Sequence, residues 1–219
     1  MNLVLEKKHE NRIEFLVDGI TSGFANMIRR YSISRIPVLA IDTVVFYDNS
    51  SPFWDEYIAH RLGLMPIITP AKTAEGTEVL FSLDAAGPKV VYSGDMKSSD
   101  DSIKMGQEKI VIATLGENQT LRFEGKAVVG TAQTHARFQS GLMAYGEKDG
   151  KFKFFVESFY QMTPKEVVKR GCEVIERDID TVINGVSKKP KKAATKKTAA
   201  KKGTKKSTKK KEETKEKEE

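Results

Sequence analysis

The stretch that decides the fold is TPKEVVKRGCEVIERDIDTVING, residues 163–185. It carries a helix start signal, because Thr163 and Glu166 match a capping box and Pro164 stands at the first helical position, where no backbone hydrogen bond is lost. Apolar residues then recur every three or four positions, at Val168, Cys172, Ile175, Ile179 and Val182. This spacing predicts a long amphipathic helix that ends near Gly185, with a seam of the kind that packs against another helix.

A second amphipathic helix is predicted over residues 21–35. Thr21 or Ser22 can accept a hydrogen bond from a free backbone N–H at its start, and Pro37 disfavours its continuation. One face of this helix carries Phe24, Met27, Ile28 and Tyr31. For this stripe, packing inside the chain and packing against another chain remain equally open. The longer helix needs a partner surface as long as itself, which favours association with another chain.

The other segments of residues 1–187 are predicted to be mainly short β-strands, with one short helix over 54–62 that ends at Gly63. Alternating and β-branched residues place the strands at 3–6, 12–17, 38–47, 64–68, 79–83, 89–92, 109–115, 121–129, 137–145 and 152–159. Helices and short strands mixed in this way predict an α+β fold.

Charge is divided unevenly along the chain, whose formal net charge is +7. Residues 188–219 hold 15 lysines, five glutamates and no aromatic or large aliphatic side chain, so this tail carries +10 and the body −3. The composition predicts a disordered tail, and overall basicity gives no argument for a DNA-binding fold. The tail is either a solubilising extension or a non-specific nucleic-acid contact, with candidate lysines at Lys196, Lys197, Lys201, Lys202, Lys205 and Lys206.

No catalytic constellation is apparent in the sequence. The phosphate-binding loop, the zinc-protease motif and the serine-hydrolase elbow are all missing. A single cysteine, Cys172, excludes disulfides and multi-cysteine metal sites within this chain. The pair Asp100–Asp101 favours a solvated loop over a magnesium site. The three histidines stand alone at His9, His60 and His135.

The sequence shows no signal for secretion or membrane insertion. Charge appears at Glu6, before any apolar segment long enough for a signal peptide. The longest apolar stretch, residues 37–46, is far too short to cross a bilayer. We therefore expect a soluble, cytoplasmic protein with no membrane partner.

Several motifs resemble the α-like subunits of multisubunit RNA polymerases. The first is IRR, residues 28–30, followed by IPVLAID, residues 36–42. More specific is VFYDNSSPFWDEYIAHRLGLMPI, residues 45–67, which resembles the larger α-like subunit of the archaeal polymerases, itself similar to the third-largest subunit of eukaryotic polymerase II. Gly130 and HARFQ, residues 135–139, resemble a further signature of this family. The resemblance covers about residues 1–185.

This resemblance implies an architecture of two parts. A dimerisation domain, an antiparallel sheet with two long helices, would comprise residues 1–46 and 147–187. A β-rich domain would be inserted over residues 47–146, and the tail at 188–219 lies outside the family pattern. The two helices would bind a smaller α-like subunit, L, through Phe24, Met27, Ile28, Tyr31, Val168, Cys172, Ile175, Ile179 and Val182.

The family also implies contacts with larger subunits. The pair Arg29–Arg30 would face the large catalytic subunits, together with Asp55, Glu56, His60 and Arg61. Small subunits N and P would dock on the same heterodimer. Some relatives hold an iron–sulfur cluster or a zinc loop, and one cysteine permits neither here, so no cofactor is expected.

The predicted function is therefore assembly of a DNA-directed RNA polymerase. The heterodimer would present a composite surface to the second-largest subunit, and this chain would supply no catalytic residue to the nucleotidyltransferase. Two alternatives stay open: a nucleic-acid-binding protein that acts through its basic tail, and an enzyme of unrecognised type. The acidic body disfavours the first, and the missing motifs disfavour the second.

Overall fold

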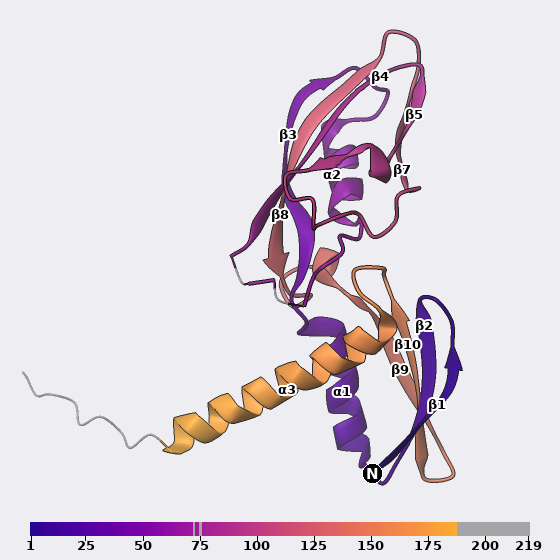
Figure 1. The fold of residues 1–219 in the computed structure, drawn as a ribbon, viewed down its shortest axis with the longest axis vertical. Helices are drawn as coiled ribbons and strands as arrows, with labels where there is room; N and C mark the ends of the chain where they lie inside the picture. Colours follow the sequence, from indigo (N-terminus) through magenta and orange to yellow (C-terminus); the bar gives the residue numbers. More distant parts are fainter. Residues whose placement is uncertain (72, 75, 188–219) are drawn as a thin grey trace, which may run out of the picture.

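The computed structural model describes residues 1–187 apart from 72 and 75, and it confirms the α+β class. Two bodies follow one another along the long axis, each with its own antiparallel sheet and its own apolar core (Figure 1). The predicted tail, with its candidate nucleic-acid lysines, lies outside the described residues.

The first body is a four-stranded antiparallel sheet with two helices on one face (Figure 1). Its helices are α1 (Ser22–Ser34) and α3 (Pro164–Ser187). Alternate residues of the two central strands are buried beneath them, and the rings of Phe15 and Phe154 stack 5.1 Å apart. In spatial order the strands are β1 (Asn2–Lys8), β2 (Arg12–Asp18), β10 (Lys151–Ser158) and β9 (Gly141–Lys148).

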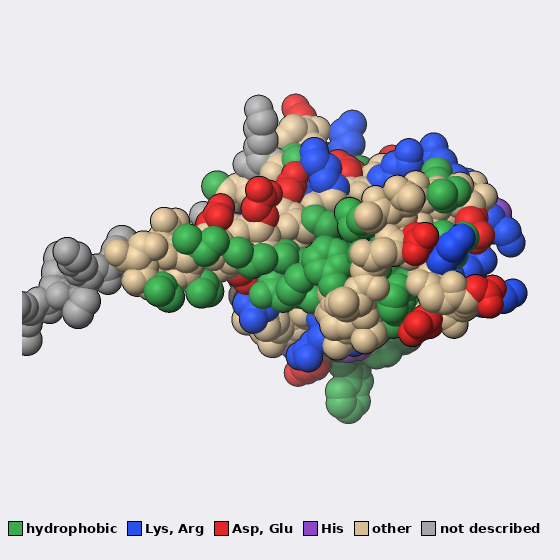
Figure 2. All heavy atoms as spheres, turned by 90° about the horizontal axis from the view of Figure 1, so that it is seen from below, with side chains coloured by type: hydrophobic (Ala, Val, Ile, Leu, Met, Phe, Trp, Pro, Cys, Tyr) green, Lys and Arg blue, Asp and Glu red, His purple; other side chains and the backbone are tan. Residues whose placement is uncertain are grey.

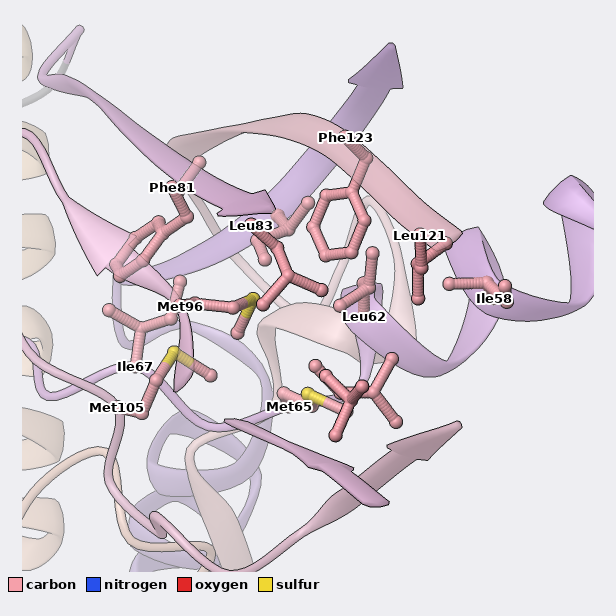
Figure 3. Packing of buried hydrophobic residues seen from close by; sticks show 14 of the residues in the cluster. Ile58, Leu62, Met65, Ile67, Phe81, Leu83, Met96, Met105, Leu121 and Phe123 are labelled. Carbon is pink, nitrogen blue, oxygen red and sulfur yellow. The ribbon is translucent and has the colours of Figure 1, made fainter. Parts of the chain in front are cut away.

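The second body encloses a short helix, α2 (Asp55–Gly63), between two sheets. Ile58 and Leu62 are fully buried on one side of this helix and point toward Phe123 and Leu121 of the larger sheet (Figure 3). The larger sheet has the order β3 (Val38–Asn49), β8 (Thr120–Gly130), β4 (Glu78–Ala86) and β6 (Lys97–Ser98). The smaller sheet pairs β5 (Lys89–Tyr92) with β7 (Val111–Leu115).

Strand β3 belongs to both cores. Val38 and Ala40 are buried in the core of the first body, while Leu39 and Ile41 are buried in that of the second. Successive side chains of a strand point to opposite faces, so four consecutive apolar residues reach two cores at once. The start of β3 thus joins the two bodies by burial on both of its faces.

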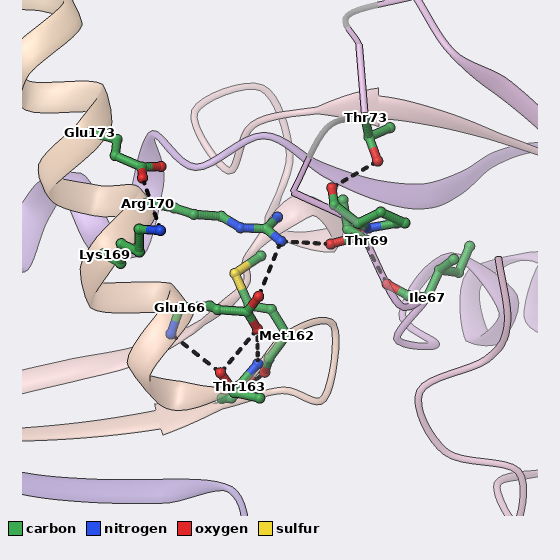
Figure 4. Close-up of polar contacts among 11 residues, drawn as sticks. Ile67, Thr69, Thr73, Met162, Thr163, Glu166, Lys169, Arg170 and Glu173 are labelled. Atoms are coloured by element: carbon green, nitrogen blue, oxygen red, sulfur yellow. Dashed lines mark hydrogen bonds and ion pairs between the residues drawn. The ribbon is translucent and has the colours of Figure 1, made fainter. Parts of the chain in front are cut away.

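Thr69 makes the main polar joint between the bodies (Figure 4). Its backbone N–H donates to the carbonyl of Gln161 at 2.9 Å, and its hydroxyl accepts from the N–H of Leu39 at 3.0 Å. The guanidinium of Arg170 on α3 donates to the carbonyl of Thr69 at 2.9 Å and lies 3.8 Å from Glu166. One residue therefore ties together β3, the segment before α3, and α3 itself.

The HARFQ motif forms a second joint. Arg137 donates to the carbonyls of Ile41 and Asp42 at 3.2 and 3.0 Å, where β3 bulges. A Cβ at Gly130 would lie 2.8 Å from the ring of the buried Phe138, so any larger residue there would force this ring to move. The sequence signature is explained by this packing between the bodies.

Two expectations about the strands were wrong. The strand expected over residues 137–145 begins only at Gly141, because His135 accepts a bond from the N–H of Arg137 and the chain forms a 3₁₀ turn, η2 (Ala136–Phe138). Residues 64–68 form no strand, and only Ile67 makes an isolated bridge, to Met105.

The domain boundary expected between 146 and 147 falls within β9, which pairs along its length with β10, so the whole strand belongs to the sheet of the first body.

We predict that Arg170→Ala lowers the free energy of unfolding by about 1–3 kcal/mol, because the largely buried carbonyl of Thr69 loses its donor. Urea denaturation followed by circular dichroism measures the change. Lys169→Ala is the matched control: its side chain is 75% exposed and pairs only with Glu173, so its removal is nearly neutral. Equal effects of the two substitutions would contradict this account of the joint.

Candidate functional site

The two helices of the first body cross at a point where both carry small residues. Gly171 of α3 faces Ser32 of α1, and a side chain at Gly171 would clash with the Ser32 hydroxyl. Ser32 is fully buried, so the helix backbones approach closely. Beyond the crossing, Arg35 and Asp178 are joined by an ion pair of 3.9 Å.

This crossing divides α3 into a covered half and an open half. Val167, Val174 and Ile175 are buried by the chain's own residues. After them, the exposed fraction of apolar side chains rises from 48% at Ile179 to 84% at Val186. We call the open stripe the distal stripe; its members recur at helical spacing and are Ile179, Val182, Ile183 and Val186.

Figure 2 shows the consequence on the surface: hydrophobic side chains line the projecting helix and continue onto the body. On α1, Phe24 is exposed, and Met27, Ile28 and Tyr31 are half-buried. Monomeric proteins rarely leave so long an apolar surface open to water. The geometry is that of an interaction face made by two helices.

The predicted interface residues thus fall into two groups. Ile175 is only 7% exposed and belongs to the chain's own packing, so its assignment to the interface is corrected. Val168 is half-buried against the same core. Cys172 is exposed, and burial of part of its side chain raises the pKa of its thiol, which disfavours the reactive thiolate. Ile28 is likewise half-buried against that core, and the remaining members, Phe24, Met27, Tyr31, Ile179 and Val182, lie on the open surface described above.

The start of α3 is fixed by the capping box expected from the sequence. The N–H of Thr163 donates to the Glu166 carboxylate at 3.0 Å, and the N–H of Glu166 points to the Thr163 hydroxyl at 3.4 Å. The bond from the Thr163 backbone holds the pKa of Glu166 below its usual value. This carboxylate is therefore engaged in supporting the helix.

A second exposed surface surrounds the start of α2. Three of the residues predicted to contact large subunits, Asp55, Glu56 and His60, are exposed, whereas the guanidinium of the fourth, Arg61, donates to the carbonyl of Val111. Sequence reasoning missed Trp54, which precedes the helix and is 80% exposed. The signal that could have found it is an aromatic side chain at the N-cap position, outside the apolar periodicity of the helix.

Next to Trp54, the rings of Phe53 and Tyr57 stack 5.3 Å apart and add to this aromatic surface. The predicted arginine pair lies on α1. Arg29 donates twice to the Asn26 side chain, at 2.8 and 3.2 Å, while Arg30 is exposed. Arg29 is thus oriented by its own helix, and Arg30 remains free to meet another surface.

Among the described residues, no group of three histidine, cysteine or acidic side chains is arranged to hold a metal ion. No helix in that part of the chain has the length and apolar character needed to cross a bilayer. The lowered pKa values of Asp95 and Glu14 arise mainly from hydrogen bonds with the Tyr92 backbone and with Lys153, respectively. The features that stand out are two exposed surfaces suited to binding other proteins.

Comparison with known proteins gives consistent matches. The family model described as the RNA polymerase Rpb3/RpoA insert domain matches residues 40–146. The Methanocaldococcus jannaschii protein named DNA-directed RNA polymerase subunit Rpo3 is 34% identical over 185 residues, covering 83% of this chain and 95% of that protein.

Proteins of the same name from two Pyrococcus species also match. The Pyrococcus horikoshii protein is 34% identical over 194 residues, covering 82% of this chain and 72% of that protein. The Pyrococcus furiosus protein is 41% identical over 149 residues, covering 65% of this chain. The matched part spans 57% of the length of the Pyrococcus furiosus protein.

Substitution by lysine should strongly lower the free energy of unfolding in the covered half of α3 and leave it nearly unchanged in the open half. Ile175→Lys buries an unpaired charge and should lower the free energy of unfolding by about 3 kcal/mol or more. Val182→Lys changes a residue that is 65% exposed and should leave that free energy unchanged to within about 0.5 kcal/mol. Chemical denaturation of both variants tests this, and a large loss of stability in Val182→Lys would show that the stripe is covered in the free chain.

Proposed function

Because this chain belongs to the Rpo3 family of DNA-directed RNA polymerase subunits, we propose that it is a non-catalytic assembly subunit of such an enzyme. The observation that carries the proposal is the open apolar face on α1 and α3, ending in the distal stripe. An apolar face of this size is unfavourable in a monomer because it is exposed to water, and the helices of a partner can bury it. In this role the chain acts by binding, and the catalytic residues belong to other subunits.

The first partner we propose is the smaller α-like subunit, L. Its helices would cover Phe24 and the distal stripe and remove this apolar surface from water. The spacing of three and four residues along the stripe matches what a second helix can interlock with. Burial of the stripe explains why the chain retains large aliphatic side chains at positions that its own sheet never reaches.

The heterodimer would then offer a second surface to the second-largest subunit. Arg30, free at the surface of α1, suits a bidentate pair with a carboxylate on that subunit. Around α2, Asp55, Glu56 and His60 surround Trp54, and an exposed tryptophan beside charged groups is typical of residues that dominate binding energy. Small subunits N and P are proposed to dock on the same heterodimer.

We propose a cytoplasmic location and no cofactor for this chain. The absence of an iron–sulfur cluster or zinc site stays a prediction from the single cysteine. The alternative function, nucleic-acid binding through the tail, falls on residues 188–219, outside the described part of the chain. Family membership favours the assembly role over this alternative.

Co-expression with an archaeal subunit L tests the proposal. We expect a 1:1 complex by size-exclusion chromatography with light scattering, and self-association of the chain when it is expressed alone, because its apolar face then meets only water or another copy. The double substitution Val182→Lys/Val186→Lys should abolish the complex, and Lys169→Ala, on an exposed site before the stripe, should preserve it. The proposal would be contradicted if the Val182→Lys/Val186→Lys variant co-purified with subunit L in the same amount as the unmodified chain.

A further inference from the structure

The last part of α3 has no packing support within the described chain. We call residues 179–187 the distal segment; each of these residues is exposed. The nearest tertiary ion pair, from Arg35 to Asp178 at 3.9 Å, lies immediately before it. The segment projects away from both bodies (Figure 1). Within the described chain, its helical form depends on its own backbone hydrogen bonds.

The composition of this segment disfavours an isolated helix. Its sequence is IDTVINGVS, in which most residues are β-branched and the others include Asn184 and Gly185, all weak helix formers. The hydroxyls of Thr181 and Ser187 donate to carbonyls one turn earlier, at 2.8 and 2.7 Å, a bond that tends to weaken a helix slightly.

The packed half of α3 supplies the nucleus for this segment, but residues of such low helix propensity propagate the helix weakly and fray without tertiary contacts. The same residues that weaken the helix, Ile179, Val182, Ile183 and Val186, also form the distal stripe. Their burial by a partner would supply the stabilisation that the segment lacks. The nine residues of the distal segment therefore combine low helix propensity with an exposed apolar face.

We infer that the distal segment becomes a stable helix only when a partner covers the distal stripe, so that its folding is coupled to binding. The inference rests on the proposed function, in which that partner is the smaller α-like subunit. Part of the association free energy is then used to order the segment. As a consequence, affinity depends on helix propensity even at positions that face away from the partner.

Hydrogen exchange measured by mass spectrometry on the full chain, alone and in complex with subunit L, tests the coupling. In the free chain we expect amides of residues 182–187 to exchange within seconds, while those of residues 171–175, at the α1 crossing, stay protected. In the complex both regions should be protected. Equal protection of the two regions in the free chain, or fast exchange of the distal segment in an assembled complex, would overturn the inference.

Two substitutions test the same point through affinity. Asn184 lies on the side of α3 opposite the distal stripe by helical periodicity, and a side chain at Gly185 meets no atom within 4 Å. Asn184→Ala should lower the dissociation constant about threefold and Gly185→Ala about fivefold, because each raises helix propensity without a new contact. Lys169→Ala, in the supported half of α3, is the control and should leave affinity unchanged.

The outcomes separate the two proposals. Unchanged affinity in both Asn184→Ala and Gly185→Ala would show that the segment is already helical in the free chain, and the coupling would be wrong while the assembly role stands. Failure of the unmodified chain to bind subunit L would contradict the proposed function. In that case, protection of residues 182–187 in the free chain would contradict the coupling as well.

Discussion

The contact between Gly171 and Ser32 determines which apolar residues this chain keeps for its own core. α1 and α3 approach closely at this point, and Val167, Val174 and Ile175, which lie within one turn or so of Gly171 along α3, are buried. The same approach sets the direction of α3, which leaves the body soon after the crossing (Figure 1). The open stripe is thus a geometric result of the crossing, since a helix that crosses another can follow it only for a limited length.

Much of this architecture follows from local sequence rules. The capping box at Thr163 and Glu166, the proline at the start of α3 and the apolar stripe of α1 predicted both helices close to their observed positions. The mixed class and most strands also followed from residue patterns. In these elements, local preference and tertiary packing favour the same conformation.

The sequence could not show which apolar residues of α3 the chain itself buries and which it leaves exposed to water. Ile175 and Ile179 occupy equivalent places in the periodic pattern, yet one is covered by the chain and the other is open to water. That difference depends on where α1 ends relative to α3, which is a tertiary property. The 3₁₀ turn at Ala136–Phe138 was missed for a similar reason, because a side chain of His135 satisfies a backbone N–H and so favours a turn over a strand.

Strand β3 couples the two bodies of the molecule mechanically. Because Val38 and Ala40 anchor one body while Leu39 and Ile41 anchor the other, no flexible linker separates the two there. A force applied at the aromatic surface of α2 would therefore reach the sheet beneath α1 and α3 through closely packed residues. In an assembled enzyme, the length of β3 would then set the distance between a subunit bound at α2 and a subunit bound at α1 and α3.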